Sequence, residues 1–348
     1  MPKVTIVIAA YNAERWLART LDSVLAQTLT DWRCHLVDDG STDATVPIVE
    51  GYAERDPRFS LVRQANAGVS AARNRVLAET VDDGPYVAVL DSDDLWLPDA
   101  LELMVGALDA DPAAVGVQSL AEYIDEDDTP IRAGEHPAIQ RRKFAVRGNR
   151  VVPAAFGPGM TFDEMIVTSG LYPPASMLFR RSALEAAGRY DESYRSQVDW
   201  EMYLRMVRGG HFAELDRQTA WYRLRAENLT GDRSTVALNQ ARLRRKAWEE
   251  SPPGSSQRRA AEVAYRHTQR GKAMYHARQL KGAAVGRRVG GVVSNAALTG
   301  YFAVHAVARR PVRPNAGLTR RVSRAQSRLW AAESARRTPD PRDGGPGP

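Results

Sequence analysis

The sequence has a single cysteine, Cys34, which excludes a disulfide within the chain. Because this thiol lies in the apolar run 32–37, we expect a small core residue rather than a nucleophile. A signal-peptide pattern is also lacking, since Met1-Pro2-Lys3 leads directly into a strand-like run. These absences favour a cytoplasmic protein.

The run 289–308 has the length of a membrane span but lacks its apolar character. Twenty residues would cross a bilayer, yet this run contains Asn295, His305 and three glycines. The pattern therefore predicts a packed or interfacial helix rather than a transmembrane one.

Charge divides the chain into an acidic front and a basic back. Residues 232–348 hold 24 basic and 7 acidic residues, whereas residues 1–231 hold 24 and 35. The basic part is helical in pattern over 231–337 and is either a solvated face or a surface for anionic lipid. Nucleic acid is a less favoured partner, because the sequence contains no known nucleic-acid module. Residues 338–348, rich in proline, glycine and charge, are expected to be disordered.

The front of the chain alternates between strand and helix patterns. Strands are predicted at 4–10, 33–37, 59–62 and 86–90, and helices at 12–27, 41–54, 69–79, 98–109 and 198–207. Asn12 is the expected N-cap of the first helix, and Ser41 or Thr42 that of the second. This alternation predicts an α/β fold with a mostly parallel, Rossmann-like sheet and flanking helices. The polar stretch 125–150 is expected to be a surface excursion.

Polar clusters follow three of the predicted strands. They are Ala10-Tyr11-Asn12, Asp38-Asp39-Gly40-Ser41 and Asp91-Ser92-Asp93-Asp94. In an open α/β sheet, ligands bind beyond the carboxyl ends of the strands, so the three clusters should converge on one cleft.

The third cluster places three carboxylates within four residues. Because they repel one another, their crowding at a strand end favours a cation between them. Carboxylate oxygens suit Mg²⁺ or Mn²⁺ better than Zn²⁺, and such ions keep positions open for substrate phosphates. The cluster therefore predicts a site for a phosphorylated donor; the alternative is a solvated strand end.

In this order and spacing the motifs resemble glycosyltransferase family 2, whose members are inverting sugar transferases with the GT-A fold. The matching segments are Val37-Asp38-Asp39-Gly40-Ser41-Thr42-Asp43, Asn66-Ala67-Gly68-Val69-Ser70-Ala71-Ala72-Arg73-Asn74 and Leu90-Asp91-Ser92-Asp93-Asp94. The resemblance covers roughly residues 3–230 and implies a GT-A domain at 1–230. A basic helical extension would follow it.

The resemblance implies a role for particular residues. Tyr11 and Asp39 would hold the nucleotide base and Arg73 would face the nucleotide, while Asp93 would be the principal ligand of Mn²⁺ or Mg²⁺. Asp199 falls where the family keeps its catalytic base. The implied donor-binding residues are Ala10, Tyr11, Asn12, Asp39, Arg73, Asp91 and Ser92, and the implied metal ligands are Asp93, Asp91 and Asp94.

Two positions depart from the family pattern. Val198 stands where relatives often have Glu, and Arg225 replaces the His of a Tyr-Arg-x-His segment. The resemblance therefore assigns no role to Arg225. Asp199, a single acid on a predicted helix, has a surface position as its alternative reading.

The implied chemistry is a single displacement. Asp199 would take the proton of an acceptor hydroxyl that attacks the anomeric carbon, so the configuration inverts. Residues 168–177, with two prolines, would form an acceptor wall. Trp96, Trp200 and Trp221 are candidates for stacking on sugar, although such residues are more often core.

The resemblance thus implies a metal-dependent inverting glycosyltransferase of bacterial polysaccharide or glycolipid synthesis. It implies a UDP- or dTDP-linked sugar as donor and a carbohydrate or a lipid-linked molecule as acceptor. The basic extension would direct a cytoplasmic protein to peripheral contact with the inner face of the membrane. One rival is a nucleotide-sugar-binding module without turnover. Another is a sugar nucleotidyltransferase. That class would need a glycine-rich loop with Lys or Arg after the first strand, and residues 10–14, which occupy that place, argue against it. A dehydrogenase is disfavoured, since no G-x-G-x-x-G follows the first strand.

Overall fold

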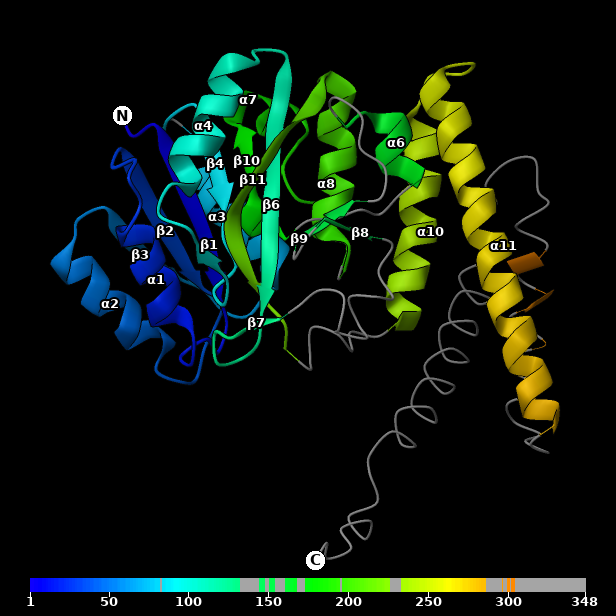
Figure 1. The fold of residues 1–348 in the computed structure, drawn as a ribbon, viewed down its shortest axis with the longest axis horizontal. Helices are drawn as coiled ribbons and strands as arrows, with labels where there is room; N and C mark the ends of the chain where they lie inside the picture. Colours follow the sequence, from blue (N-terminus) through cyan, green and yellow to red (C-terminus); the bar gives the residue numbers. More distant parts are fainter. Residues whose placement is uncertain are drawn as a thin grey trace, which may run out of the picture. The chain divides into compact units, whose positions relative to one another are not determined.

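A computed structural model of the chain describes residues 1–81, 83–131, 144–147, 150–153, 160–167, 173–194, 196–225 and 233–285, with five more residues between 296 and 303. The chain divides into two compact units, Met1–Leu229 and Thr230–Pro348. Both are drawn in Figure 1. The predicted disordered tail lies outside the described residues, as does the run 289–308 apart from those five.

The first unit is built on one mixed, mostly parallel sheet (Figure 1). Its strands follow the order β3 (Phe59–Arg63), β2 (Trp32–Asp38), β1 (Val4–Ala10), β4 (Tyr86–Val89), β10 (Met177–Arg180), β6 (Ala114–Ile124), β11 (His211–Arg223) and β5 (Leu95–Trp96). Strand β10 is antiparallel to both of its neighbours, β4 and β6. The predicted α/β class is confirmed, and the four predicted strands are present with bounds shifted by no more than a residue at either end.

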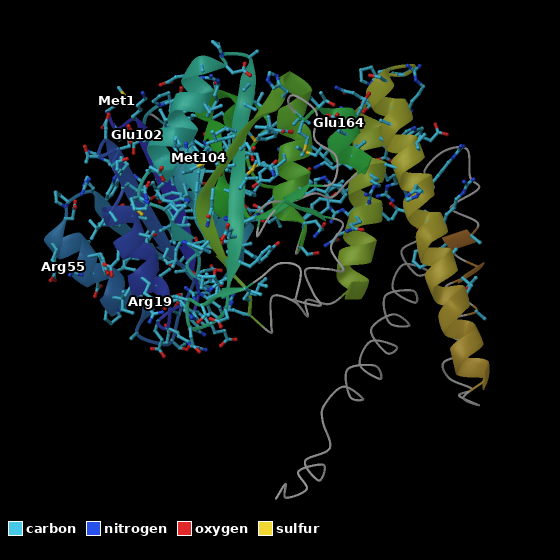
Figure 2. All side chains as sticks on the ribbon, viewed as in Figure 1. Met1, Arg19, Arg55, Glu102, Met104 and Glu164 are labelled. Atoms are coloured by element: carbon cyan, nitrogen blue, oxygen red, sulfur yellow. The ribbon has the colours of Figure 1, made fainter. Side chains whose placement is uncertain are left out.

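Helices flank this sheet. They are α1 (Leu17–Leu25), α2 (Thr45–Arg55), α3 (Val69–Glu79), α4 (Ala100–Ala110), α6 (Phe162–Val167), α7 (Arg181–Ala186) and α8 (Val198–Met206). Side chains fill the space between the layers: Met104 of α4 is fully buried, whereas Arg55 at the end of α2 is exposed (Figure 2).

The first two helices begin later than predicted. Helix α1 starts at Leu17 and α2 at Thr45, and neither N-cap residue, Trp16 or Ala44, makes a side-chain capping bond. Asn12 has a left-handed backbone (φ 48°), and its Oδ1 accepts from the Thr42 backbone N–H at 2.9 Å. The predicted caps were wrong because these side chains bond to each other's loops instead of to their own helices.

Part of the predicted surface excursion extends the sheet. Strand β7 (Pro130–Ile131) and β9 (Arg150–Pro153) both pair antiparallel with β6, and β8 (Phe144–Arg147) pairs with β9. The rest of that stretch, 132–143 and 148–149, lies outside the described residues.

Two of the three candidate sugar-stacking tryptophans belong to the core. Trp200 is fully buried and its indole N–H donates to the Met165 carbonyl at 3.0 Å. Trp96 is 4% exposed and donates to the Ala175 carbonyl at 2.6 Å. Both indoles are therefore unavailable to a sugar, and Trp221 alone is half-buried. Ala175 lies in a buried turn, 174–176, so this part of the expected acceptor wall faces inward.

Cys34 is fully buried, and burial raises the pKa of its thiol. This confirms the core residue expected from its apolar neighbours.

The second unit contains α10 (Arg233–Glu250) and α11 (Ser256–Val285), which pack against each other. The break between them falls at 251–255, where the pattern predicts it, and Gly254 there has a left-handed backbone (φ 79°). No helix within the described ranges is both long enough and apolar enough to cross a membrane.

Candidate active site

The carboxyl ends of four strands meet at one edge of the sheet. Strands β2 and β4 both run parallel to β1, and β4 and β6 share a direction because each is antiparallel to β10. The loops that follow Ala10, Asp38, Val89 and Ile124 therefore lie at the same edge. These loops carry all three polar clusters, together with a fourth segment, 125–129.

The loops after β1 and β2 are bonded to each other by several reciprocal contacts. The backbone N–H of Asn12 donates to Ser41 Oγ at 2.9 Å, and that of Ala13 donates to Thr45 Oγ1 at 2.8 Å. In return, the Ala44 N–H donates to Glu14 Oε2 at 2.9 Å. Ala10 takes part through its carbonyl, which accepts from the Asp39 N–H at 2.8 Å. The first two clusters thus form one connected surface.

Asp39 is buried and holds the entrance of helix α3. Its Oδ1 accepts from Gln64 Nε2 and from the Ala67 N–H, and its Oδ2 accepts from the Gly68 N–H, each at 2.8 Å. Gly68 has φ 93°, a conformation that favours glycine. A carboxylate oxygen has two lone pairs, so Oδ2 retains capacity for a further donor. Tyr11, 54% exposed, lies on the open side of the same loop system.

Arg73 links two of the predicted site residues. Its guanidinium donates from Nη1 to Asp199 Oδ1 at 2.7 Å and from Nη2 to Asp91 Oδ1 at 2.6 Å. The side chain is 3% exposed, and burial alone would lower its pKa, but the two carboxylates raise it well above the ordinary value. Helix α3 therefore brings together an acid from the β4 loop and one from α8.

Asp199 lies in the first turn of α8, two residues after the N-cap residue Gln197, which has a left-handed backbone (φ 63°). Its side chain is half-buried, 22% exposed, and is ion-paired with Arg73. Burial raises the pKa of Asp199, Arg73 lowers it and Asp91 raises it again, with a net increase. A carboxylate with a raised pKa is a stronger proton acceptor.

The sequence analysis did not identify Asn74 and Tyr190, which lie beside the Arg73–Asp199 ion pair. Asn74 and Tyr190 bond in both directions: Asn74 Nδ2 donates to the Tyr190 carbonyl, and the Tyr190 N–H donates to Asn74 Oδ1, both at 2.9 Å. The ring of Tyr190 lies 5.2 Å from the Arg73 guanidinium. The only available signal was the position of Asn74 directly after Arg73 in its motif.

Asp93 and Asp94 are buried, and their ionised forms are disfavoured by burial and by neighbouring carboxylates. Burial, followed by the charge of Asp91, raises the pKa of Asp93 to about 6. Burial and then the charge of Asp93 raise the pKa of Asp94 well above its ordinary value. Oδ1 of Asp94 accepts from the Arg223 N–H at 2.9 Å, whereas its Oδ2 is buried without a hydrogen-bond partner among the described residues. Ser92 is half-buried, and its carbonyl accepts from Thr20 Oγ1 at 3.1 Å.

Arg223, at the end of β11, ties the acidic loop to segment 125–129. The side chain is fully buried; its Nε donates to the Asp93 carbonyl at 2.8 Å and its Nη1 to the Asp125 carbonyl at 2.9 Å. Its Nη2 lies 2.5 Å from Asp128 Oδ1. This residue was recognisable only as part of the Tyr-Arg-x-His resemblance, which assigned it no role.

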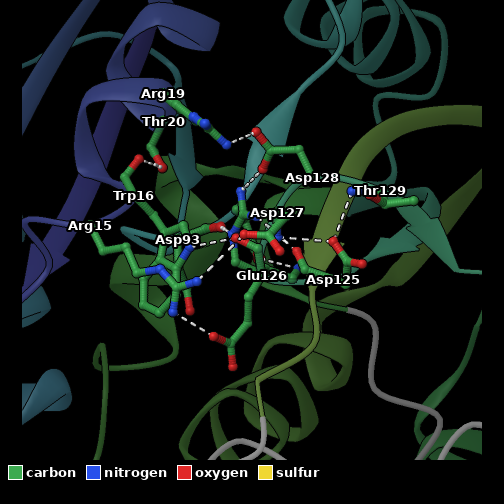
Figure 3. A network of polar contacts seen from close by, with 12 residues as sticks. Arg15, Trp16, Arg19, Thr20, Asp93, Asp125, Glu126, Asp127, Asp128 and Thr129 are labelled. Atoms are coloured by element: carbon green, nitrogen blue, oxygen red, sulfur yellow. Dashed lines mark hydrogen bonds and ion pairs between the residues drawn. The ribbon is translucent and has the colours of Figure 1, made fainter.

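Segment 125–129 is fastened to the start of α1 by arginines (Figure 3). Arg15 pairs with Glu126 and Arg19 with Asp128, while the Trp16 indole N–H donates to the Glu126 carbonyl at 3.1 Å. The Trp16 ring also faces the guanidinium of Arg225 at 5.2 Å. Arg225 Nε in turn lies 2.8 Å from Asp93 Oδ2.

The acidic loop suits a divalent cation in its chemistry. Its ligands are hard oxygens, one buried oxygen of Asp94 lacks a donor, and the raised pKa values show that further positive charge would be favourable. The side chains are turned apart, however: Asp91 faces Arg73 and Asp93 faces Arg225. Within the part of the chain that the structure describes, no three His, Cys, Asp or Glu side chains stand close enough to hold a metal together.

Comparison with known proteins identifies the family to which this chain is similar. The family described as "Glycosyl transferase family 2" matches residues 5–186. Chondroitin synthase of Escherichia coli is 29% identical over 218 residues, which are 62% of this chain and 28% of that protein. The putative glycosyltransferase EpsE of Bacillus subtilis is 29% identical over 231 residues, 65% of this chain and 74% of that protein. The chain thus spans little more than a quarter of the chondroitin synthase.

Solved structures show the same fold. The mannosyltransferase PcManGT of Pyrobaculum calidifontis, in complex with GDP-Man and Mn²⁺, matches with a TM-score of 0.57 at 20% identity and covers 97% of this chain and 88% of its own. TarS 1–349 of S. aureus, in complex with UDP-GlcNAc, matches with a TM-score of 0.53 at 18% identity and covers 84% and 90%. The predicted GT-A fold is confirmed.

Proposed function

The chain belongs to glycosyl transferase family 2, and on that premise we propose that it moves a sugar from a UDP- or dTDP-linked donor to an acceptor hydroxyl with inversion. The observation that carries the proposal is the bridge made by Arg73. It connects Asp199, the proposed base, with Asp91 on the donor side at 2.7 and 2.6 Å. Base and donor loop are thereby held in one frame, as a single displacement requires.

We propose that the nucleotide of the donor binds at the loops after β1 and β2, apart from the catalytic base. Tyr11 and Asp39 are the proposed nucleotide-base residues, with Ala10, Asn12 and Ser92 around them. The exposed ring of Tyr11 and the remaining lone pair of Asp39 Oδ2 support this assignment. TarS with UDP-GlcNAc and PcManGT with GDP-Man support a nucleoside-diphosphate sugar as donor.

Asp199 would accept the proton of the acceptor hydroxyl as that oxygen attacks. Arg73 keeps this carboxylate ionised and oriented, since its guanidinium favours the charged form. Burial opposes ionisation, so the pKa remains above that of an ordinary aspartate and the base stays effective.

A divalent cation, Mn²⁺ or Mg²⁺, is part of the proposal, with Asp93 as principal ligand and Asp91 and Asp94 beside it. Such an ion offsets the charge that develops on a leaving diphosphate. The presence of Mn²⁺ in PcManGT, a protein of similar fold, supports a divalent cation here.

The proposed setting is polysaccharide or glycolipid synthesis at the cytoplasmic face of the membrane. The likeness to chondroitin synthase supports polysaccharide synthesis, and the proposed acceptor is a carbohydrate or a lipid-linked molecule. We assign the catalytic domain to residues 1–230 and a basic helical extension to 231–337. The excess of positive charge in that extension would attract anionic lipid.

The first test is thermal unfolding with UDP, dTDP, GDP and ADP, each with Mn²⁺ or with EDTA. A ligand at 100 times its Kd adds about 2.7 kcal/mol to stability, which a melting curve resolves. One nucleotide should stabilise the wild type, and Asp39→Asn should lose that shift. Asp127→Asn is the matched control, because its side chain is 85% exposed.

Turnover is tested separately by donor hydrolysis and by transfer to acceptor. Activity that Asp199→Asn abolishes supports the transferase. Nucleotide binding with no hydrolysis or transfer would support the binding-module alternative, and no shift with any nucleotide would overturn the donor site.

A further inference from the structure

One of the two positions that depart from the family pattern, Arg225, contacts the proposed cation ligand directly. Arg225 follows β11, and its Nε lies 2.8 Å from Oδ2 of Asp93. The two side chains are 29% and 11% exposed, so solvent screens this pair only in part.

Arg225 is held in this position from a second side. Its guanidinium lies 5.2 Å from the centre of the Trp16 ring, within the range of a cation–π contact. The ring is itself fixed, because its N–H donates to the Glu126 carbonyl at 3.1 Å. The contact with Asp93 therefore does not depend on a single flexible side chain.

Arg225 and a divalent cation compete for the same oxygen. Mg²⁺ lies about 2.0–2.1 Å from its oxygen ligands, whereas the Arg225 nitrogen already stands 2.8 Å from Asp93 Oδ2. Two positive groups on one carboxylate oxygen would repel each other strongly at this separation. Cation binding to Oδ2 of Asp93 thus requires Arg225 to move away.

We propose that Arg225 is a built-in competitor of the divalent cation at Asp93, and that a nucleoside diphosphate relieves this competition by drawing the guanidinium onto its phosphates. Arginine matches phosphate oxygens with parallel hydrogen bonds, so a diphosphate offers Arg225 an acceptor in place of Asp93. Cation and nucleotide then bind cooperatively, and the coupling is reciprocal. The inference rests on the proposed function, whose donor and cation it uses.

The primary experiment measures Mn²⁺ binding to the full chain without nucleotide, by electron paramagnetic resonance of the free ion. Arg225→Gln should bind Mn²⁺ about tenfold more tightly than wild type, the scale expected for releasing a charge-assisted contact. Arg225→Lys, which keeps the charge, should remain near wild type. Arg19→Gln is the matched control, because it removes a positive charge paired with Asp128 at the same corner.

A second measurement determines the coupling. Saturating UDP, or whichever nucleotide stabilises the protein, should tighten Mn²⁺ binding in wild type by a larger factor than in Arg225→Gln. A melting curve of each variant shows whether it is folded.

Equal tightening by Arg225→Gln and Arg19→Gln would overturn the inference, since the effect would then be general electrostatics. An unchanged coupling factor would also overturn it. Failure of the proposed function is seen separately, as the absence of nucleotide binding in EDTA and in Mn²⁺ alike.

Discussion

Replacing Asp93 by asparagine should stabilise the metal-free protein at pH 8. Burial and the charge of Asp91 raise the pKa of Asp93 from 3.8 to about 6 in the fold. A difference of about two pKa units corresponds to about 3 kcal/mol by which the ionised side chain destabilises the folded state. Asparagine has a similar shape without the charge, so this cost disappears.

The gain depends on pH in a defined direction. Between about pH 4 and 6 the folded protein binds more protons than the unfolded chain, so the wild type loses stability as the pH rises through this window. Near pH 4 Asp93 is neutral in the fold, and wild type and Asp93→Asn should have similar stability. Above pH 6 the two should separate by the full amount.

Thermal melts of both proteins in EDTA, from pH 4 to 8, measure the difference. For a unit of this size, about 3 kcal/mol corresponds to roughly 6–12 °C in Tm. Asp127→Asn, whose side chain is 85% exposed, should leave the Tm within about a degree or two of wild type. An Asp93→Asn variant with no gain at pH 8, or with the same gain at pH 4, would refute the electrostatic reasoning.

Three further predictions concern the arginines and the base. Asp199→Asn should lower kcat by about 10²–10⁴ with the donor KM retained in steady-state kinetics; a KM effect alone would contradict its role. Activity should fall as the pH drops through the raised pKa of Asp199, and Arg73→Gln should move that acid limb to higher pH, since Arg73 lowers this pKa. Arg223→Gln should cost about 3–5 kcal/mol in urea unfolding, because it strands buried acceptors, and a loss below about 1 kcal/mol would mean that Asp128 and the carbonyls find other partners.

The strand ends were predictable from the sequence because local signals determine them. Apolar runs such as 86–90 end abruptly at acids, and parallel topology then places the ends at one edge. The amino-acid sequence alone therefore sufficed to place Asp91 and Asp39 at the same edge of the sheet.

The ion pairs of Arg73 with Asp91 and Asp199 were not predictable from the sequence. Arg73 was expected to face the nucleotide, but nothing in the sequence indicated its bridge between Asp91 and Asp199, the latter 126 positions away along the chain. Only tertiary packing of α3 against the loop at Tyr190 decides this geometry. The wrong helix caps have a similar cause, because Ser41 Oγ accepts from the Asn12 N–H and Asn12 Oδ1 accepts from the Thr42 N–H of the other loop.

The reciprocal bonds between the loops after β1 and β2 have a consequence for engineering donor preference. A surface loop ordinarily accepts exchange or insertion by itself, but here each loop supplies hydrogen-bond partners to the backbone of the other. Transplanting 11–14 from a relative without 41–45 would leave backbone amides unpaired on both sides. The two segments therefore form one structural unit. A change of nucleotide specificity would have to be introduced into both at once.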